Sequence, residues 1–262
     1  MAYIEGPGLP IKSGSSPSGV RVTYIGNSGF SVAIGGRHIL IDAIFAGFAG
    51  DYQLPRNVRQ ALVEGHSPFD DVDVILITHH HADHFDAPMV RRFMDKNPKT
   101  RLVSTAQVTA QLGDLGDRII TLAAVKGKPD QMNVEGIQVK ALYLPHSSPV
   151  AAGKVEDINF GYFVEVDGFR FFHTGDCVPR LIDMTVPPCP GKSIDAAFVG
   201  HFYFKDDPVN TKFIKEWIHA KYLFAAHYAY SGNVDRNKIK SLFPDVILFE
   251  EELQSWDMPL GK

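Results

Sequence analysis

The sequence has few cysteines, no long apolar run and no excess of positive charge. Two cysteines, Cys177 and Cys189, are too few for a disulfide framework, and we therefore expect a reduced, cytoplasmic location. No apolar run reaches the roughly 18–20 residues that a membrane helix needs. The N-terminal stretch lacks the basic and apolar segments of a secretory signal. The formal net charge of −4 gives no electrostatic reason to expect a nucleic-acid partner.

The composition is that of a folded α/β protein. The chain has 262 residues, of which 45% are apolar and 21% charged, and this length is ample for a hydrophobic core. Residues 1–19 are rich in Gly, Pro and Ser, and they predict an N-terminal arm. Because no linker interrupts the rest, we expect residues 20–262 to form a single domain.

The domain divides into two halves of similar organisation. Each half begins with short alternating apolar runs, which predict antiparallel strands, and continues with alternating strands and helices. The first half opens with VRVTYIG, GFSVAIGG and RHILIDA; the second opens with a hairpin at Asp167-Gly168 and closes with a predicted strand in DVILFEE. Helices are predicted at 58–64, 86–97, 106–116, 208–220 and 235–243. Two such halves predict two mixed β-sheets packed face to face with helices outside, a four-layer α/β/β/α sandwich.

The stretch LITHHHADHFDAP holds four histidines and an aspartate within six positions. Successive strand residues point to opposite faces, so His79 and His81 share a face while His80 points away. His79 and His81 can therefore hold one metal ion together, and His80 is expected to be a bystander. Asp83 and His84 follow where the chain turns, and they can serve a second ion. Imidazole and carboxylate ligands suit Zn²⁺, Mn²⁺ or Fe²⁺.

The position of this stretch argues against a chance run of surface histidines. It follows the continuous apolar strand DVDVILIT, and it precedes a helix that Asp86 can cap with Pro88 in the first turn. The histidines therefore lie at the carboxyl edge of a predicted sheet, which is where α/β proteins form their sites.

The motif T-H-x-H-x-D-H after an apolar strand resembles the signature of the metallo-β-lactamase-fold superfamily of metallohydrolases. Further motifs of that family are present in the expected order: ILIDA before the histidine motif, and ALYLPHS, FFHTGD and LFAAH after it. The resemblance implies a first metal ion held by His79, His81 and His146, a second held by Asp83, His84 and His227, Asp176 bridging both, and Asp42 orienting a ligand histidine.

Within the superfamily the sequence is most similar to the branch that contains L-ascorbate 6-phosphate lactonase and bacterial metal-dependent hydrolases. The stretches YIGNSGFSVAIGGRHILIDA, LPHSSP and GYFVEVDGFRFFHTGD carry this similarity. The sequence departs from the branch at Ala43, where proline is common, and in GHFYFKDD, which replaces a glycine-rich stretch. In that second stretch His201 and Tyr203 are candidate substrate-binding residues, with packing of the His201 ring within its loop as an equal alternative.

The resemblance implies a dinuclear metal-dependent hydrolase that cleaves a small anionic ester, lactone or phosphodiester with a metal-bridging hydroxide. Zn²⁺ is the first choice for the two divalent ions, with Mn²⁺ or Fe²⁺ as alternatives. Asp83 is the candidate catalytic residue, which orients the nucleophile and passes its proton onward. The small net positive charge of such a site favours anionic small molecules over neutral ones.

Three other functions stay open. A nuclease or phosphodiesterase of this fold acting on RNA would need a basic groove, and the sequence has no Lys/Arg cluster of that kind. A mononuclear iron dioxygenase of the same fold would share most of the predicted ligands. A non-enzymatic metal-binding scaffold is disfavoured because every expected ligand is present. The chain carries no interface signal, and a homo-oligomer is left open.

Several single residues outside the motifs receive simpler predictions. His38, His66 and His219 are expected to be ordinary surface residues. His173 is predicted to make structural hydrogen bonds, and Cys177 to be a small buried side chain.

Overall fold

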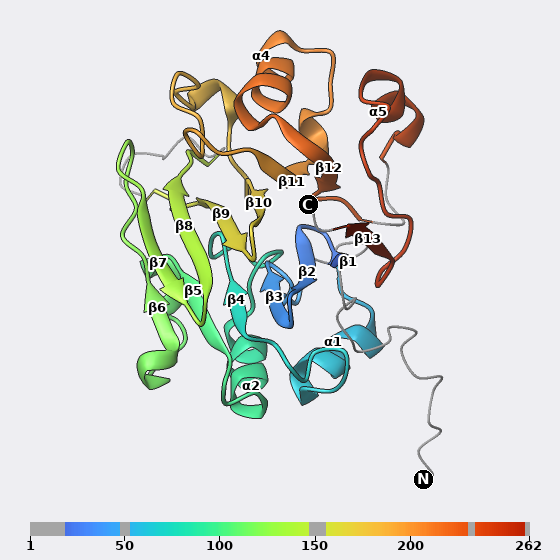
Figure 1. The fold of residues 1–262 in the computed structure, drawn as a ribbon. Coiled ribbons are helices and arrows are strands. Elements are labelled where there is room, and N and C mark those ends of the chain that lie inside the picture. The colour runs from blue at the N-terminus through green and yellow to red at the C-terminus, as the bar shows by residue number, and fades with distance from the viewer. Residues whose placement is uncertain (1–18, 48–52, 147–155, 230–233, 260–262) are drawn as a thin grey trace.

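The structure, a computed structural model, describes residues 19–47, 53–146, 156–229 and 234–259. Two β-sheets lie in the middle of the molecule, with helices α1 and α2 below them and α4 above them in the view of Figure 1. The predicted arm, residues 1–19, falls outside the described residues except for Gly19, which begins the first strand. Within the described residues, no helix combines the length and the apolar character that a membrane span requires.

The first sheet has seven strands in the order β13-β1-β2-β3-β4-β5-β6. Its strands are β1 (Gly19–Gly26), β2 (Gly29–Ile34), β3 (Arg37–Ile41), β4 (Val74–Leu76), β5 (Arg101–Ser104), β6 (Ile119–Thr121) and β13 (Ser255–Pro259). The meander predicted for the first three strands is present as two antiparallel pairings. The pairings from β3 to β6 are parallel, so this sheet is mixed.

The second sheet has six strands in the order β12-β11-β10-β9-β8-β7. Its strands are β7 (Asp130–Val134), β8 (Ile137–Tyr143), β9 (Phe160–Val166), β10 (Phe169–His173), β11 (Ile194–Gly200) and β12 (Ala220–Ala226). The hairpin predicted at Asp167-Gly168 joins β9 to β10, and both turn residues have positive φ. Parallel pairings of β11 with β10 and β12 make this sheet mixed as well.

The helices cover the outer faces of the sheets. The α-helices are α1 (Arg56–Glu64), α2 (Ala87–Lys96), α3 (Ala106–Thr109), α4 (Pro208–Lys212) and α5 (Arg236–Leu242), and a π-helical stretch, η4 (Phe213–Ile218), continues α4. Short 3₁₀ turns are η1 (Gly116–Arg118), η2 (Pro179–Leu181) and η3 (His201–Tyr203). Asp86 caps α2 by accepting a hydrogen bond from the backbone N–H of Met89, at 2.8 Å.

Strand alternation divides the core between two faces of the first sheet. In β4, Val74 and Leu76 join the cluster that fills the space between the sheets, whereas Ile75, and Ile77 just after the strand, join the cluster under α1 and α2. On the far side, Trp217 of η4 packs its ring against Phe172 of the second sheet. The predicted four-layer α/β/β/α sandwich is therefore confirmed.

Two predictions of local structure are wrong. The stretch DVILFEE is not a strand: Ile247 makes an isolated bridge to Phe224, and the last strand is β13, which pairs with β1. The signal of β13 is weak because it is an edge strand with Met258 as its one buried residue. The helix predicted at 106–116 ends at Thr109.

The prediction that His38 is a surface residue is also wrong. It is buried, its Nε2 lies 2.7 Å from the hydroxyl of Ser31, and its Nδ1 lies 2.8 Å from a carboxylate oxygen of Asp71. His38 lies in β3, after the partly buried Arg37 and before three buried apolar residues.

Candidate metal centre

The predicted ligands and Asp42, predicted to orient one of them, gather at the ends of five strands from both sheets. Asp42 follows β3, the histidine-rich stretch follows β4, His146 follows β8, Asp176 follows β10 and His227 follows β12. The face-to-face packing of the two sheets brings these strand ends together, although the residues span most of the chain.

The ligand atoms form two adjoining groups. In the first, the ring nitrogens of His79, His81 and His146 lie within 4.8 Å of one another. The second group meets the same criterion and comprises Asp83, His84, Asp176 and His227. The structure therefore brings together all seven residues that the sequence predicted as metal ligands, in the two sets that were predicted.

Asp176 faces both groups with one carboxylate. Its Oδ2 lies 3.9 Å from Nε2 of His79 and 3.8 Å from Nε2 of His146, both in the first group. The same oxygen lies 3.0 Å from Nε2 of His227, and Oδ1 lies 3.4 Å from Nε2 of His84, both in the second group. A carboxylate in this place can be shared by two ions.

Buried ligand atoms without a hydrogen-bond partner test whether these residues fit a metal. Nε2 of His79, His84 and His146 and Oδ1 of Asp176 are such atoms, and all of them point into the two groups. A buried polar atom that lacks a partner costs about 1–3 kcal/mol, so a cluster of such atoms needs a common partner. Nitrogen and carboxylate donors without thiolate suit Zn²⁺, Mn²⁺ or Fe²⁺. The residues therefore fit divalent cations.

A fully buried carboxylate orients two of the histidines. Asp42 Oδ2 lies 2.8 Å from Nδ1 of His84, so the ring donates to the carboxylate and turns its Nε2 toward the second group. The same oxygen accepts a hydrogen bond from the hydroxyl of Thr78, which lies 2.9 Å from Nδ1 of His79. The backbone N–H of Thr78 donates to Asp42 Oδ1 at 2.8 Å. Asp42 holds a left-handed backbone with φ 47°, which is uncommon for a residue other than glycine.

In the second group, carboxylates and histidines lie close together and shift one another's pKa values. Burial is the largest influence on the pKa of His84 and lowers it, but Asp176 and Asp42 outweigh burial and hold this pKa well above its usual value. Burial also acts to lower the pKa of His227, and Asp176 with Asp83 raises it to about 9. The pKa of Asp176 is well below its ordinary value because His84 and His227 outweigh its burial. The cluster thus favours positive charge, which protons or metal ions can supply.

In the first group the pKa values of His79 and His81 shift the other way, because burial is the dominant influence on them. Burial, followed by the proximity of His84, lowers the pKa of His79 well below its usual value. Burial also lowers the pKa of His81. Neutral imidazole is the form that binds a metal ion.

Sequence reasoning missed Asn27, which lies in the turn between β1 and β2. Its side-chain amide donates to the backbone carbonyl of Asp83 at 2.9 Å and to Asp83 Oδ2 at 3.3 Å. Its own carbonyl accepts a hydrogen bond from the backbone N–H of His227 at 2.9 Å. Asn27 therefore ties together two residues of the second group. The sequence GNSG is typical of a turn, and Asn27 has the left-handed φ of 49° that such a turn needs. The contact with Asp83, however, depends on the tertiary fold.

Gly175 allows Asp176 to approach Asn159. The backbone N–H of Asp176 donates to Oδ1 of Asn159 at 3.1 Å. A Cβ atom on Gly175 would lie 2.1 Å from that same oxygen, and φ at Gly175 is 53°. The glycine of the FFHTGD motif is thus required by both its backbone angle and the buried amide beside it.

Asp157 is a second residue that sequence reasoning missed, and it changes the surroundings of His80. His80 belongs to neither of the two groups, but with His81 and Asp157 it forms a third set whose ligand atoms lie within 4.8 Å of one another. The Nε2 of His80 lies 3.6 Å from Oδ1 of Asp157. Nε2 of His81 lies 3.4 Å from the other oxygen of the same carboxylate. A lone aspartate before the strand NFGYFVEV carries no signal of its own, because the fold alone brings it to the histidines.

The remaining candidates lie near the second group or pack in the core. Nδ1 of His201 donates to the backbone carbonyl of His227, so His201 borders the centre. Tyr203 is buried, and its ring packs against Phe213. His173 has one ring nitrogen 3.0 Å from the carbonyl of Ser28 and the other accepting from the N–H of Gly175, as a structural hydrogen-bonder does. Cys177 is fully buried, as predicted.

Comparison with known proteins identifies the family. The family model described as a beta-lactamase superfamily domain matches residues 37–227, which is most of the chain. The chain therefore belongs to the beta-lactamase superfamily. The match runs from β3 to the last residue of the metal centre, and so it includes every predicted ligand.

Individual relatives agree with this placement. A protein from Thermococcus onnurineus that is named a metal-dependent hydrolase is 26% identical over 158 residues, which is 60% of this chain and 61% of that protein. Another protein so named, from Aeropyrum pernix, is 27% identical over 234 residues and is matched over 82% of its length. The solved structure of Igni18, described as a metallo hydrolase from Ignicoccus hospitalis, aligns with a TM-score of 0.65 at 19% identity and covers 93% of this chain and 100% of that one.

Proposed function

We propose that this protein is a hydrolase that uses two divalent cations to cleave a small anionic ester, lactone or phosphodiester. Zn²⁺ is the preferred choice for both cations. The observation that carries the proposal is the convergence of partnerless ligand atoms in two groups that share Asp176. Relatives named as metal-dependent hydrolases support it.

His79, His81 and His146 would hold one cation, and Asp83, His84 and His227 the other, with Asp176 between them. A pair of divalent cations supplies a water of lowered pKa and an electrophile for the attacked oxygen. The two groups contain two carboxylates and otherwise neutral ligands, so two divalent cations leave an excess of positive charge. That excess favours an anionic substrate.

Within this scheme Asp83 holds and moves a proton. Its pKa is lowered because His227 and His84 outweigh the effect of burial, so the side chain is ionised near neutral pH and can accept a proton. Its Oδ2 lies 3.2 Å from Nε2 of His227, and the amide of Asn27 fixes the same oxygen. These two contacts hold the carboxylate in one orientation within the second group.

The variant Asp83→Asn tests this role. A carboxamide keeps the size and the hydrogen-bonding shape but cannot accept a proton, so kcat should fall by at least about 100-fold while one or more metal ions stay bound. Asp86→Asn is the matched control, because asparagine caps a helix as well as aspartate does. Wild-type turnover in Asp83→Asn, on any ester or phosphodiester that the wild type cleaves, would disprove the role.

Metal analysis tests the number of ions. We expect two Zn²⁺ per chain after dialysis against Zn²⁺ and removal of excess, and fewer than one would disprove the two-metal proposal. His81→Ala should lose one ion, whereas His80→Ala should retain both. Two further assays separate the alternatives. Oxygen uptake with a persulfide by protein loaded with Fe²⁺ in place of Zn²⁺ would favour an iron dioxygenase, and strongly salt-dependent RNA binding would favour a nuclease.

A further inference from the structure

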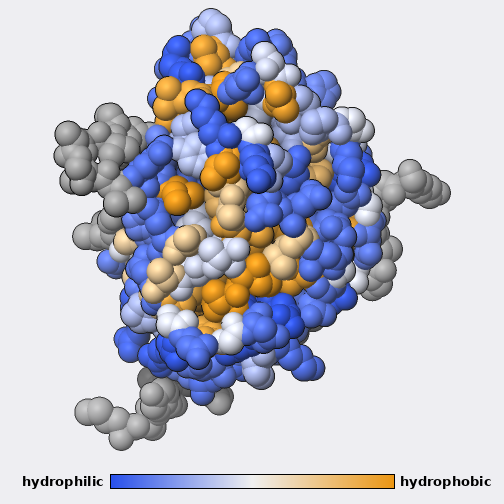
Figure 2. All heavy atoms as spheres, turned by 90° about the vertical axis from the view of Figure 1, so that its left-hand side faces the viewer, coloured by the Kyte–Doolittle hydropathy of each residue, from blue (hydrophilic) through white to orange (hydrophobic). Residues whose placement is uncertain are grey.

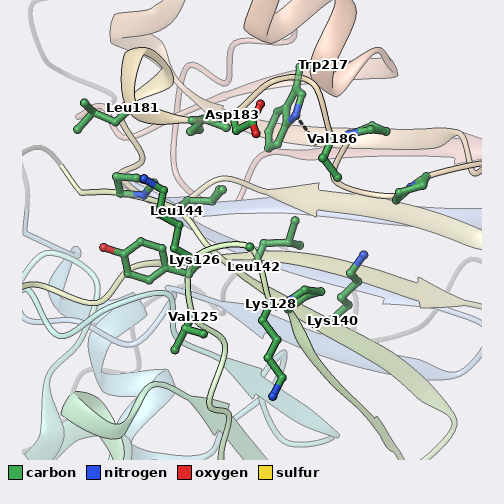
Figure 3. Close-up of a pocket in the computed structure, with 17 residues that line it drawn as sticks. Val125, Lys126, Lys128, Lys140, Leu142, Leu144, Leu181, Asp183, Val186 and Trp217 are labelled. Carbon is green, nitrogen blue, oxygen red and sulfur yellow. Dashed lines mark hydrogen bonds between the residues drawn. The ribbon is translucent and has the colours of Figure 1, made fainter.

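An apolar groove runs along the molecule beside the metal centre. Its main cavity has a volume of about 290 Å³, near the lower end of the range of about 300–1,000 Å³ for small-molecule sites. We define the apolar groove by the lining residues Val125, Leu142, Leu144, Leu181, Val186 and Trp217. Figure 3 shows Leu181, Val186 and Trp217 on one side of the cavity and Leu142 and Leu144 on the other.

Exposed aliphatic side chains concentrate around this groove. Among the described residues, four large hydrophobic side chains are exposed, and three of them line the groove: Val125 at 54%, Leu181 at 56% and Val186 at 60% exposure. The fourth, Trp256, lies on β13. Figure 2 looks onto the side of the molecule that carries β7 and β8, and it shows hydrophobic surface gathered in the middle of that face. Exposed apolar patches are typical of surfaces that bind a protein, a membrane or a ligand, and here the patch surrounds a cavity of the size of a small molecule.

Contacts within the protein hold the wall around Trp217 in place. The indole N–H donates to the backbone carbonyl of Val186 at 2.7 Å, so the ring offers the groove no free donor. Phe213 stacks on the indole with ring centroids 5.3 Å apart, and Phe172 contacts it edge-on. A ligand would therefore meet a rigid apolar surface that needs no rearrangement to receive a chain.

Positive charge borders the groove. Lys126, Lys128 and Lys140 belong to its lining, against one acidic residue, Asp183. The Nζ of Lys140 donates to the carbonyl of Pro188 at 3.1 Å, and within the described part of the chain no ion pair is recorded for any of the three lysines. An occupant that carries a negative charge would be attracted to this border, whereas a neutral or cationic one would not.

One end of the groove adjoins the metal centre. A second cavity shares Tyr143, Pro145 and Leu181 with the first and extends it to Glu156 and Ile158. Pro145 directly precedes the predicted ligand His146, and its carbonyl accepts a hydrogen bond from the backbone N–H of Val178 at 2.8 Å. Glu156 and Ile158 flank Asp157, whose carboxylate lies 3.4 Å from His81.

We propose that the apolar groove binds the unbranched hydrocarbon chain of an amphipathic anionic substrate, with its ester group at the metal centre. The inference rests on the proposed function and deepens it, because it names the substrate class. The apolar lining recognises the chain, and the lysine border recognises the negative charge.

Direct binding tests the groove without any turnover. We expect hexanoate, octanoate and decanoate, titrated calorimetrically into the metal-loaded protein, to bind about fourfold more tightly per added methylene, which corresponds to about 0.8 kcal/mol each. The trend should stop at the chain length that fills the cavity. 1-Octanol should bind more weakly than octanoate at low salt, and the two should converge as salt screens the lysines.

Variants at exposed positions locate the binding without endangering the fold. Leu181→Glu and Val186→Glu should each weaken decanoate binding at least tenfold, because each places a charge at the mouth of the groove. Trp256→Glu is the matched control, since it changes an exposed hydrophobic residue elsewhere, and it should leave binding unchanged. Lys126→Ala combined with Lys128→Ala should weaken octanoate by threefold or more and leave 1-octanol unaffected.

Hydrolysis of anionic esters of increasing chain length separates this inference from the proposed function. Rising kcat/KM with chain length, lost in Leu181→Glu, supports both. Cleavage of short esters with no chain-length trend overturns the inference alone. Binding that depends on hydrocarbon chain length, without hydrolysis of any ester, overturns the proposed function and the placing of an ester group at the metal centre. The groove would then stand as a binding site for hydrocarbon chains. A concentration-dependent dimer that Leu181→Glu abolishes would mean that a second copy occupies the groove, which also overturns the inference.

Discussion

Replacing Asp42 by asparagine tests how far one buried carboxylate organises the metal centre. The carboxylate accepts three hydrogen bonds, from the N–H of Thr78 at 2.8 Å, the hydroxyl of Thr78 at 2.7 Å and Nδ1 of His84 at 2.8 Å. Asparagine keeps one acceptor oxygen for the N–H, but its NH₂ group then faces two donors. Two hydrogen bonds to a charged group, at about 1.5–3 kcal/mol each, make a loss of about 3–6 kcal/mol if they are additive.

The metal affinity should fall as well, because the ring of His84 loses the partner that aims its Nε2. Loss of such an orienting partner typically lowers metal affinity about 10–100-fold. Urea unfolding of the metal-free protein and Zn²⁺ competition with a chelator measure the two effects.

The control is Asp71→Asn, which removes a similar aspartate–histidine contact. Asp71 lies 2.8 Å from Nδ1 of His38, but its side chain is 70% exposed. The free energy of unfolding should therefore change by less than about 1 kcal/mol in this variant. Equal stability losses in the Asp42 and Asp71 variants, together with unchanged Zn²⁺ affinity, would refute the role assigned to Asp42.

Two further predictions concern charge and backbone at the same centre. The pKa of His227 is raised to about 9, so its stabilising effect on the metal-free protein is complete below about pH 6.5 and is lost as the pH rises through about 9. Urea unfolding between pH 7 and 9 should show the decline. His227→Gln should make the decline shallower and leave the part that comes from His84, whose pKa is also raised. Gly175→Ala should destabilise by more than Gly168→Ala, because a Cβ at Gly175 meets Asn159 Oδ1 at 2.1 Å whereas one at Gly168 meets nothing within 4 Å. Both glycines have positive φ, so the backbone strain of an alanine is common to the two variants, and the difference between their melting temperatures reports the clash with Asn159. Equal losses of stability in the two variants would contradict the clash.

The fold was predictable wherever one face of an element is buried. Alternation in β1 to β3 and the apolar run of β4 follow from the packing of strands, and the structure confirms them. The stretch DVILFEE misled the prediction because buried residues such as Val246 and Phe249 pack in the core without joining a continuous ladder. The edge strand β13 escaped notice because four of its five residues are exposed.

For the candidate site, local sequence was informative about ligands and silent about their neighbours. The histidines, Asp83 and Asp176 follow strands in recognisable motifs, and the family resemblance supplied their grouping. Asn27 and Asp157 have no such motif, and each acquires its contact from a segment far away in the chain. The apolar groove likewise combines the residues after β6, the end of β8 and the loop that follows Asp176.

The sequence by itself determined the chemistry that is available: a histidine-rich turn after a buried strand, three later motifs in order, and few cysteines. Spacing along a strand decides which side chains share a face, and this local geometry needs no tertiary contact. The tertiary structure alone decided what those side chains meet. The packing of two sheets joins five strand ends into one centre with Asp176 between its halves, buries Asp42 behind His84, and leaves an apolar groove beside the site. Such contacts depend on how distant segments pack, which no local pattern encodes.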